Sequence, residues 1–225
     1  MKKYILSIIF CLWASCAWAF PPGFIGAVTQ GADADGYTLI LNDTLYASDY
    51  IAIESYTVTP GPGGPWASIQ PGILVYTDGA RGTSSSSYSA ITPDVIGFGY
   101  IIINAKTGYA AGTRVVAIGL QSADTLDNTK YDGYTLSLDG LGTLTLRRVD
   151  DSVLTLLDTT TCTGHDVNTH YDIKLTRTVS GVTGEVVGQN CTVTSSDTTY
   201  QSGSPYIGIS NTASRITDFK AYENN

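Results

Sequence analysis

The sequence predicts an all-β protein, an antiparallel β-sandwich, from a two-residue hydrophobic period and closely spaced turn signals. Apolar and polar residues alternate over several short segments, which places the apolar side chains on one face of a half-buried strand. The clearest alternating positions are Leu136, Leu138, Leu144 and Leu146. Turn dipeptides lie between such segments: Asp78-Gly79, Asp132-Gly133, Asp139-Gly140 and Ser180-Gly181. Short strands with regular turns are typical of sandwiches and barrels, and we find no long segment with helical periodicity.

Strands are expected where Val, Ile, Thr, Tyr and Leu dominate between turn signals, because these residues fit a pleated surface. In chain order the expected strands cover residues 37–41, 46–53, 66–69, 72–77, 84–90, 95–104, 113–121, 134–138, 142–149, 152–158, 170–178, 183–188, 206–209 and 215–222. The Pro- and Gly-rich stretch 59–65 is expected to be a surface loop. As an interdomain linker it would cut off only about 40 residues, too few for an independent core.

The first 19 residues have the pattern of a secretory signal peptide. Two lysines precede an apolar run over 4–13, and Ala17-Trp18-Ala19 forms an A-x-A cleavage pattern. The run is too short to span a bilayer, and we expect no membrane span elsewhere. We therefore expect a protein that is secreted or extracellular, with the periplasm or cell surface as other destinations. The alternative for this segment is a lipid anchor on Cys16.

Residues 20–225 are expected to form a single β-sandwich domain with an extended N-terminal segment. Loss of Lys2 and Lys3 with the signal changes the net charge from −8 to −10. An acidic chain has the wrong sign for nucleic acid, so that class of partner is excluded. Cys162 and Cys191 are the cysteines that remain, and in an exported protein they predict a structural disulfide.

Several segments together resemble one known family. They are Trp66–Val75, Ala117–Leu120, Tyr131–Leu136, Leu144–Val149, Thr155–Leu157, Tyr171–Leu175, Asp197–Gly203, Ile207–Ile209 and Ile216–Tyr222. In this order, over residues 66 to 222, they resemble the concanavalin A-like lectin/glucanase domains, including the laminin-G-like group. The resemblance implies a jelly roll of two curved antiparallel sheets. It also implies a concave face that holds a glycan in members that bind one.

Glycan recognition requires aromatic rings beside polar groups, because sugar C–H faces pack on rings while hydroxyls need hydrogen bonds. The candidate ligand-binding residues are Trp66, Tyr76, Tyr88, Tyr100, Asn104, Gln121, Asp132 and Tyr134. Each tyrosine has the alternative of an ordinary position in a sheet or core, because tyrosine is common in strands.

The acidic residues decide whether glycoside hydrolysis is expected. Glucanases of the resembled family place a Glu-x-Asp-x-x-Glu motif on one strand, so that two carboxylates flank the scissile bond. This motif is absent, and the three glutamates are Glu54, Glu185 and Glu223. His165 and His170 do not lie in the Gln-x-His pattern of lyases with this fold. We therefore expect no enzyme activity; a separated pair such as Glu54 and Glu185 is the catalytic alternative.

A calcium site is the one cofactor that the acidic residues suggest. Asp124, Asp127 and Asn128 lie close together, and oxygen ligands suit Ca²⁺. A polar loop between strands would use the same residues for turns. Asp33 and Asp35 are a second candidate pair. The resemblance adds a structural calcium near the first and last strands, to which Glu54 and Asp218 could contribute.

Three functions follow from these observations. The first is a secreted, non-catalytic carbohydrate-binding or adhesion module that recognises a polysaccharide on its concave sheet. The second is a structural subunit of an extracellular filament, matrix or coat, formed by self-assembly through an added strand. The third is a polysaccharide-degrading hydrolase or lyase of the same fold.

Overall fold

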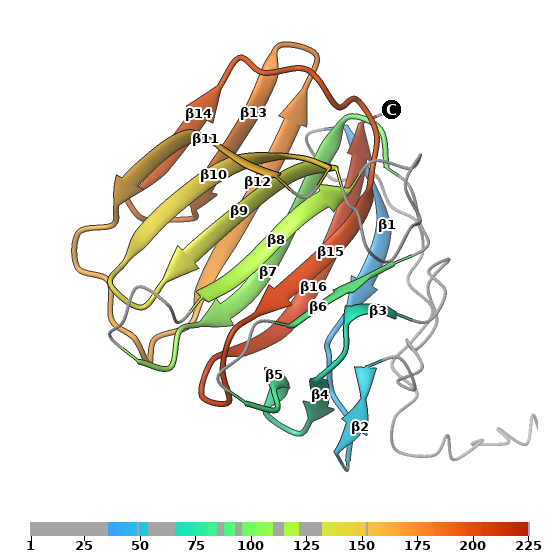
Figure 1. The fold of residues 1–225 in the computed structure, drawn as a ribbon, viewed down its shortest axis with the longest axis vertical. Coiled ribbons are helices and arrows are strands. Elements are labelled where there is room, and N and C mark those ends of the chain that lie inside the picture. The colour runs from blue at the N-terminus through green and yellow to red at the C-terminus, as the bar shows by residue number, and fades with distance from the viewer. Residues whose placement is uncertain are drawn as a thin grey trace, which may run out of the picture.

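A computed structural model describes residues 36–48, 50–53, 66–84, 88–92, 96–109, 115–121, 132–151 and 153–224. The expected signal peptide over 1–19 and the loop over 59–65 lie outside these ranges. Two antiparallel sheets pack face to face, which confirms the predicted β-sandwich (Figure 1). Among the described residues, no helix has the length and apolar character of a membrane span.

Sheet A has nine strands in the order β14-β13-β12-β7-β16-β5-β4-β2, with β1 also paired to β16. Their bounds are β1 Tyr37–Asp43, β2 Ile51–Ala52, β4 Ile73–Tyr76, β5 Gly79–Gly82, β7 Gly99–Lys106, β12 Tyr171–Thr178, β13 Gly181–Val186, β14 Thr192–Ser195 and β16 Arg215–Asn224. The long strands β7, β12 and β16 lie side by side in the middle of the sheet (Figure 1). The first and last described strands are therefore neighbours, since β1 pairs with β16.

Sheet B has seven strands in the order β11-β10-β9-β8-β15-β6-β3. Their bounds are β3 Ala67–Gln70, β6 Tyr88–Ile91, β8 Val115–Gln121, β9 Gly133–Asp139, β10 Thr143–Asp150, β11 Val153–Thr161 and β15 Ser204–Ile209. Strands β8 to β11 form a consecutive meander, as the predicted hairpins require. The strand β15 then closes against β8 after a long connection through sheet A.

The core lies between the sheets and follows the predicted alternation. In β7 the residues Ile101, Ile103 and Ala105 are buried, while their neighbours in the strand are half-buried on the outer face. The leucines that predicted the sandwich, Leu136, Leu138, Leu144 and Leu146, are all fully buried. Burial of one face by period-two residues provides the main free energy of folding for such a sandwich.

Two short strands were not expected from the sequence. The strand β5 contains two glycines in four residues, which gives it little strand propensity of its own. It forms because it pairs with β4 on one side and meets β16 on the other. The strand β14 has four residues and pairs with the middle of β13, from Val182 to Glu185, at the edge of sheet A. The expected strand 46–53 is reduced to β2 and a single bridge at Tyr46.

A disulfide joins Cys162 and Cys191, as the sequence predicts. Cys162 follows β11 in sheet B, and Cys191 precedes β14 in sheet A. Both residues are buried at the edge where these strands approach each other. The bond therefore ties the two sheets together at one side of the sandwich.

Candidate functional site

The outer face of sheet A carries an ordered set of aromatic, basic and polar side chains. The pairing of β16, β7 and β12 places them in three rows across the sheet. The rows are Tyr222, Tyr100 and Thr176; Lys220, Ile102 and Lys174; and Asp218, Asn104 and Asp172. We call these nine residues the outer-face strip. Paired residues of adjacent strands point to the same face, so each row projects away from the core.

The aromatic row is held by contacts among its own rings. Tyr100 stacks on Tyr222 with ring centroids 4.5 Å apart and planes 21° apart. Tyr37 of β1 meets Tyr100 edge to face at 5.0 Å. Lys174 places its Nζ 4.4 Å from the Tyr100 centroid and 3.7 Å from an oxygen of Glu185. Stacking and cation–π contacts restrict these side chains before any ligand arrives.

Asn104 organises the polar row. Its Nδ2 donates to Asp172 Oδ1 at 2.8 Å, so its Oδ1 faces the donors on the other side. Thr217 Oγ1 donates to this Oδ1 at 2.9 Å, and His170 Nδ1 lies 2.9 Å from it. His170 must therefore carry its proton on Nδ1. Burial, with repulsion from Lys106, lowers the pKa of His170, which favours this neutral form.

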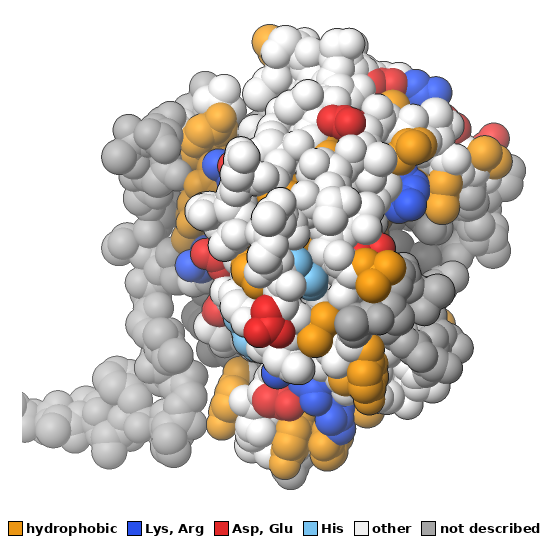
Figure 2. Space-filling model, turned by 90° about the vertical axis from the view of Figure 1, so that its left-hand side faces the viewer, with side chains coloured by type: hydrophobic (Ala, Val, Ile, Leu, Met, Phe, Trp, Pro, Cys, Tyr) orange, Lys and Arg blue, Asp and Glu red, His pale blue; other side chains and the backbone are white. Residues whose placement is uncertain are grey.

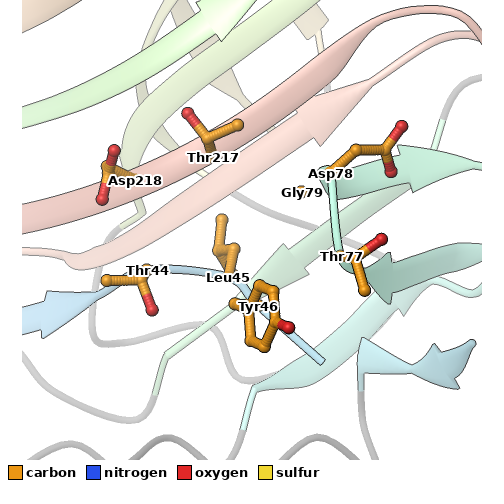
Figure 3. A pocket seen from close by; sticks show the side chains of 8 residues that line it. All are labelled: Thr44, Leu45, Tyr46, Thr77, Asp78, Gly79, Thr217 and Asp218. Carbon is orange, nitrogen blue, oxygen red and sulfur yellow. The ribbon is translucent and has the colours of Figure 1, made fainter. Parts of the chain in front are cut away.

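Two cavities open beside the strip and share Asp218. The smaller, about 160 Å³, is lined by Ile102, Ile103, Asn104, Asp172, Asp218 and Lys220. The larger, about 460 Å³, is lined by Thr44, Leu45, Tyr46, Thr77, Asp78, Gly79, Thr217 and Asp218; we call it the β1–β16 pocket (Figure 3). Figure 3 shows Thr44 and Asp218 on one side of this pocket, with Thr77 and Asp78 on the other.

The part of the pocket wall that follows β1 in the sequence is held in place by hydrogen bonds to Asp43. Asp43 is 3% exposed, and its carboxylate accepts hydrogen bonds from Leu45 N at 2.9 Å and Trp66 Nε1 at 2.7 Å. Leu45 is buried with a φ of 45°, a conformation that a leucine rarely adopts. Across the pocket, Arg215 Nε donates to Asp78 at 2.8 Å.

Two of the predicted ligand-binding residues are in the core, and this part of the prediction is wrong. Trp66 is 1% exposed and packs edge to face on Phe219, with centroids 5.1 Å apart. Tyr134 is fully buried. Its hydroxyl donates to Asp197 and accepts from the amide of Tyr200. Neither ring is accessible to a sugar. An aromatic residue in an alternating segment occupies either face, and the period alone does not say which.

The other predicted residues are dispersed over the molecule. Tyr100 and Asn104 lie together on β7, in the strip. Tyr76 on β4 stacks on Tyr50 with centroids 4.0 Å apart. Asp132 precedes β9 and accepts a hydrogen bond from the amide of Asp151. The side chains of Tyr88 and Gln121, on β6 and β8 of sheet B, lie outside the described part.

The predicted metal ligands Asp124, Asp127 and Asn128 also lie outside the described residues, as do Asp33, Asp35 and Glu54. Within the described ranges, no three His, Cys, Asp or Glu side chains gather as a metal site. Asp218 lies on the last strand, next to the first, where the resemblance implies a calcium ion. The other acid that lines the same pocket, Asp78, is paired with Arg215. Calcium therefore stays a prediction.

A network around Asp197 was not predicted. Asp197 accepts hydrogen bonds from Tyr134 at 2.5 Å and from Arg148 at 2.6 Å. Arg148 also bonds Asp150 at 2.8 Å, and Asp150 accepts from Tyr200 at 2.7 Å. These bonds hold the segment 197–200, which precedes β15, against β9 and β10. The bonds Arg148–Asp197, Tyr200–Asp150 and Tyr134–Asp197 join residues 49, 50 and 63 positions apart, so no local motif reveals them.

The network changes the ionisation of its members. Burial alone would raise the pKa of Asp197, but hydrogen bonds, first from Tyr134 and then from Thr199 and Arg148, lower it to about 2. Burial and the bond to Asp197 raise the pKa of Tyr134 to about 12. Bonds from Arg148 and Tyr200 lower the pKa of Asp150. All members are therefore locked in one charge state at neutral pH, which suits a structural role.

The outer face of sheet B has a different character. Its central residues are small or carry hydroxyls: Thr135, Ser137 and Thr145 are each 8–9% exposed, and Arg147 donates to Ser137 at 3.2 Å. At its edge, β11 exposes Val153, Leu154 and Leu156. Figure 2 shows the side of the molecule that lies at the left in Figure 1. Uncharged surface dominates there, with separate apolar patches and interspersed acidic and basic side chains.

The fold is the concanavalin A-like jelly roll that the sequence resembles, and solved structures confirm this. Similar structures include the carbohydrate binding module CBM66 from Bacillus subtilis, at 12% identity and a TM-score of 0.55, covering 71% of this chain and 92% of that one. Another is the exoplasmic/lumenal domain of VIP36 in a Ca²⁺/Man3GlcNAc-bound form, at 10% identity and 0.55, covering 70% and 83%.

A third similar structure is a galectin-like protein of unknown function from Bacillus subtilis, at 13% identity and a TM-score of 0.53, covering 87% of this chain and 97% of that one. No protein-family model matches the sequence, and no curated protein matches it. At these identities the likeness concerns the fold alone, and function must be argued from the surface.

Proposed function

We propose that the protein is a secreted, non-catalytic carbohydrate-binding module that binds a polysaccharide along the outer-face strip of sheet A. One observation carries this proposal: stacked tyrosines and hydrogen-bonding side chains lie in neighbouring rows on the same face of the sheet. Tyr100 and Tyr222 provide ring surface, and Asn104, Asp172 and Lys220 provide donors and acceptors in rows at most four residues away along the strands. Shallow glycan recognition needs this combination.

The opposite face, the outer surface of sheet B, supports binding less well. Tyr206 is 8% exposed there, with its ring packed over Gly119, where a Cβ atom would lie 2.0 Å from it. Arg147 already bonds Ser137. Among the described residues of this face we find no stacked pair of rings. The face remains the alternative binding surface, and the experiment below separates the two.

The absence of catalysis is part of the proposal. Glu185, half of the sequence's catalytic alternative, lies on β13 within 3.7 Å of Lys174, where it holds the lysine over Tyr100. In this proposal its role is to position Lys174 beside the aromatic row. Reducing-sugar release from the bound polysaccharide should stay at the level of a buffer blank, and Glu185→Gln should not change it.

Secretion is supported by the disulfide, because such bonds persist in oxidising compartments. The N-terminal pattern of residues 1–19 supports the same destination. Cell fractionation with detection of the processed chain tests this directly; an unprocessed chain in a reducing compartment would contradict it.

Affinity electrophoresis against neutral polysaccharides tests binding and its location. Wild-type protein should be retarded by at least one of β-glucan, xylan, mannan or fructan. Tyr100→Ala should weaken that retention by about tenfold, the loss expected for one stacking contact of about 1.4 kcal/mol. Tyr109→Ala is the matched control, since Tyr109 is 55% exposed in the loop after β7. Loss of retention in Arg147→Ala, with Tyr100→Ala unaffected, would move the site to sheet B.

A further inference from the structure

The β1–β16 pocket adjoins the outer-face strip through Asp218 but differs from it in shape. The strip is a surface across three strands, whereas the pocket is a cavity of about 460 Å³ (Figure 3). We propose that this pocket holds one neutral sugar residue, a branch or chain end of the glycan bound along the strip. The proposal rests on the proposed function and deepens it, because it specifies a branched or terminal glycan.

The lining of the pocket matches the chemistry of a sugar. Thr44 and Thr77 line it with hydroxyl-bearing side chains, and Asp218 brings a carboxylate. Thr217 also lines it, but its hydroxyl is bonded to Asn104. The Asp218 carboxylate has an electrostatic attraction to His170 but makes no hydrogen bond or ion pair with the described residues, so its oxygens can accept from two vicinal sugar hydroxyls. The volume lies within the range of small-molecule sites.

Tyr46 provides the apolar surface that a sugar ring also needs. Its side chain is 57% exposed and lines the pocket beside the buried Leu45. A half-exposed ring next to hydroxyls and a carboxylate lets one sugar residue stack its C–H face while its hydroxyls bond to the wall. Thr217 also connects the pocket to the strip, since its hydroxyl donates to Asn104 Oδ1 at 2.9 Å.

The pocket is built before a ligand binds. Leu45 keeps its φ of 45° because Asp43 bonds its amide, and this places Thr44 and Tyr46 on the wall. Backbone in a sparsely populated conformation persists only where the surroundings impose it, and it is concentrated at binding sites. Gly79, with a φ of 107°, allows β5 to approach β16, where a Cβ atom would lie 2.6 Å from a carbonyl oxygen.

The charges of the pocket favour a neutral sugar over an acidic one. Asp78 and Asp218 both line it, and the guanidinium of Arg215 is already bonded to Asp78. A uronate would bring a third carboxylate near Asp218, which like-charge repulsion disfavours.

Calorimetric titration of the full chain with a retained polysaccharide tests the proposal, using its linear backbone and its branched form as separate ligands. Tyr46→Ala should weaken binding of the branched form about tenfold and leave the linear form unchanged. Asp218→Asn, which belongs to both the strip and the pocket, should weaken binding of the branched form more than binding of the linear form. Asp151→Asn, an exposed aspartate in the β10–β11 turn, is the matched control and should change neither. Equal affinities of wild type and both variants for the branched form would overturn the proposal.

A second measurement separates this proposal from the proposed function. Methyl glycosides of glucose, galactose, mannose and fructose are added to the labelled protein, and amide shifts of Thr44 and Thr217 are followed. Shifts that Asp218→Asn abolishes are expected even if no polysaccharide binds the strip. If no glycoside shifts these amides, the pocket is not a sugar site. Shifts produced by Ca²⁺ alone, lost in Asp218→Asn, would show a cation site and equally overturn the proposal.

Discussion

The Asp197 network makes stability depend on pH in a way that can be calculated. Asp197→Asn removes the charge that Tyr134 and Arg148 stabilise, with little change of shape. The side chain of Asp197 is 13% exposed, so solvent screens these bonds only weakly. The pKa of Asp197 falls from 3.8 to about 2 in the folded protein. At about 1.4 kcal/mol per pKa unit, ionised Asp197 contributes roughly 2.5 kcal/mol at neutral pH.

The sign of the effect follows from the direction of the shift. Since the folded-state pKa lies below the unfolded value, the full contribution is present above about pH 5. It is lost as the pH falls through the interval between the two pKa values, and roughly half remains at pH 3. Protonated Asp197 and its asparagine variant should then have similar stability.

Urea unfolding followed by far-UV circular dichroism measures this difference. At pH 7 we expect Asp197→Asn to lower the free energy of unfolding by roughly 2–3 kcal/mol relative to wild type. At pH 2 the difference should be close to zero. Asp151→Asn is the control for an exposed aspartate. A loss in Asp197→Asn that is equally large at pH 2 and pH 7 would refute the reasoning, since it would show that the ionised form contributes nothing extra.

Three further predictions concern the stability of the fold. Asp43→Ala should lower the free energy of unfolding by about 3–5 kcal/mol, because the buried Trp66 Nε1–H and a backbone amide lose their acceptor; calorimetry would measure it, and a change below 1 kcal/mol would contradict it. Replacing both Cys162 and Cys191 by alanine should lower the free energy of unfolding by about 3.5 kcal/mol, the loop-entropy value for a separation of 29 residues; urea unfolding of both forms checks this. Gly79→Ala should destabilise by about 1–3 kcal/mol, since its φ of 107° and a nearby carbonyl oppose a methyl group; an unchanged melting temperature would count against it.

Much of the fold could be predicted from the sequence because the alternation of apolar and polar residues governs it. The alternation in segments such as 134–138 and 142–149 determines which face is buried, and β9 and β10 follow it closely. The strand β5 could not be predicted, since Gly79–Gly82 has weak propensity and depends on pairing with β4 and β16. Strands of that kind are products of tertiary context.

The candidate site was predictable only in part. Tyr100 and Asn104 share one face of one strand, so period-two reasoning could group them. Their partners Tyr222 and Lys174 lie 70 or more positions away in the sequence, and only the sheet order brings them together. Trp66 was misassigned because a buried tryptophan needs a partner for its N–H, and Asp43, 23 residues earlier, is not visible as that partner in the sequence.

Binding along the outer face of sheet A is the central claim, and amide shift mapping with a retained oligosaccharide tests it most directly. The proposal predicts that the largest shifts fall on β7, β12 and β16, at Tyr100, Asn104 and Lys220, with further shifts at Thr217 when the sugar is branched. Shifts confined to β9 and β10 of sheet B, at Thr135 and Arg147, would contradict it.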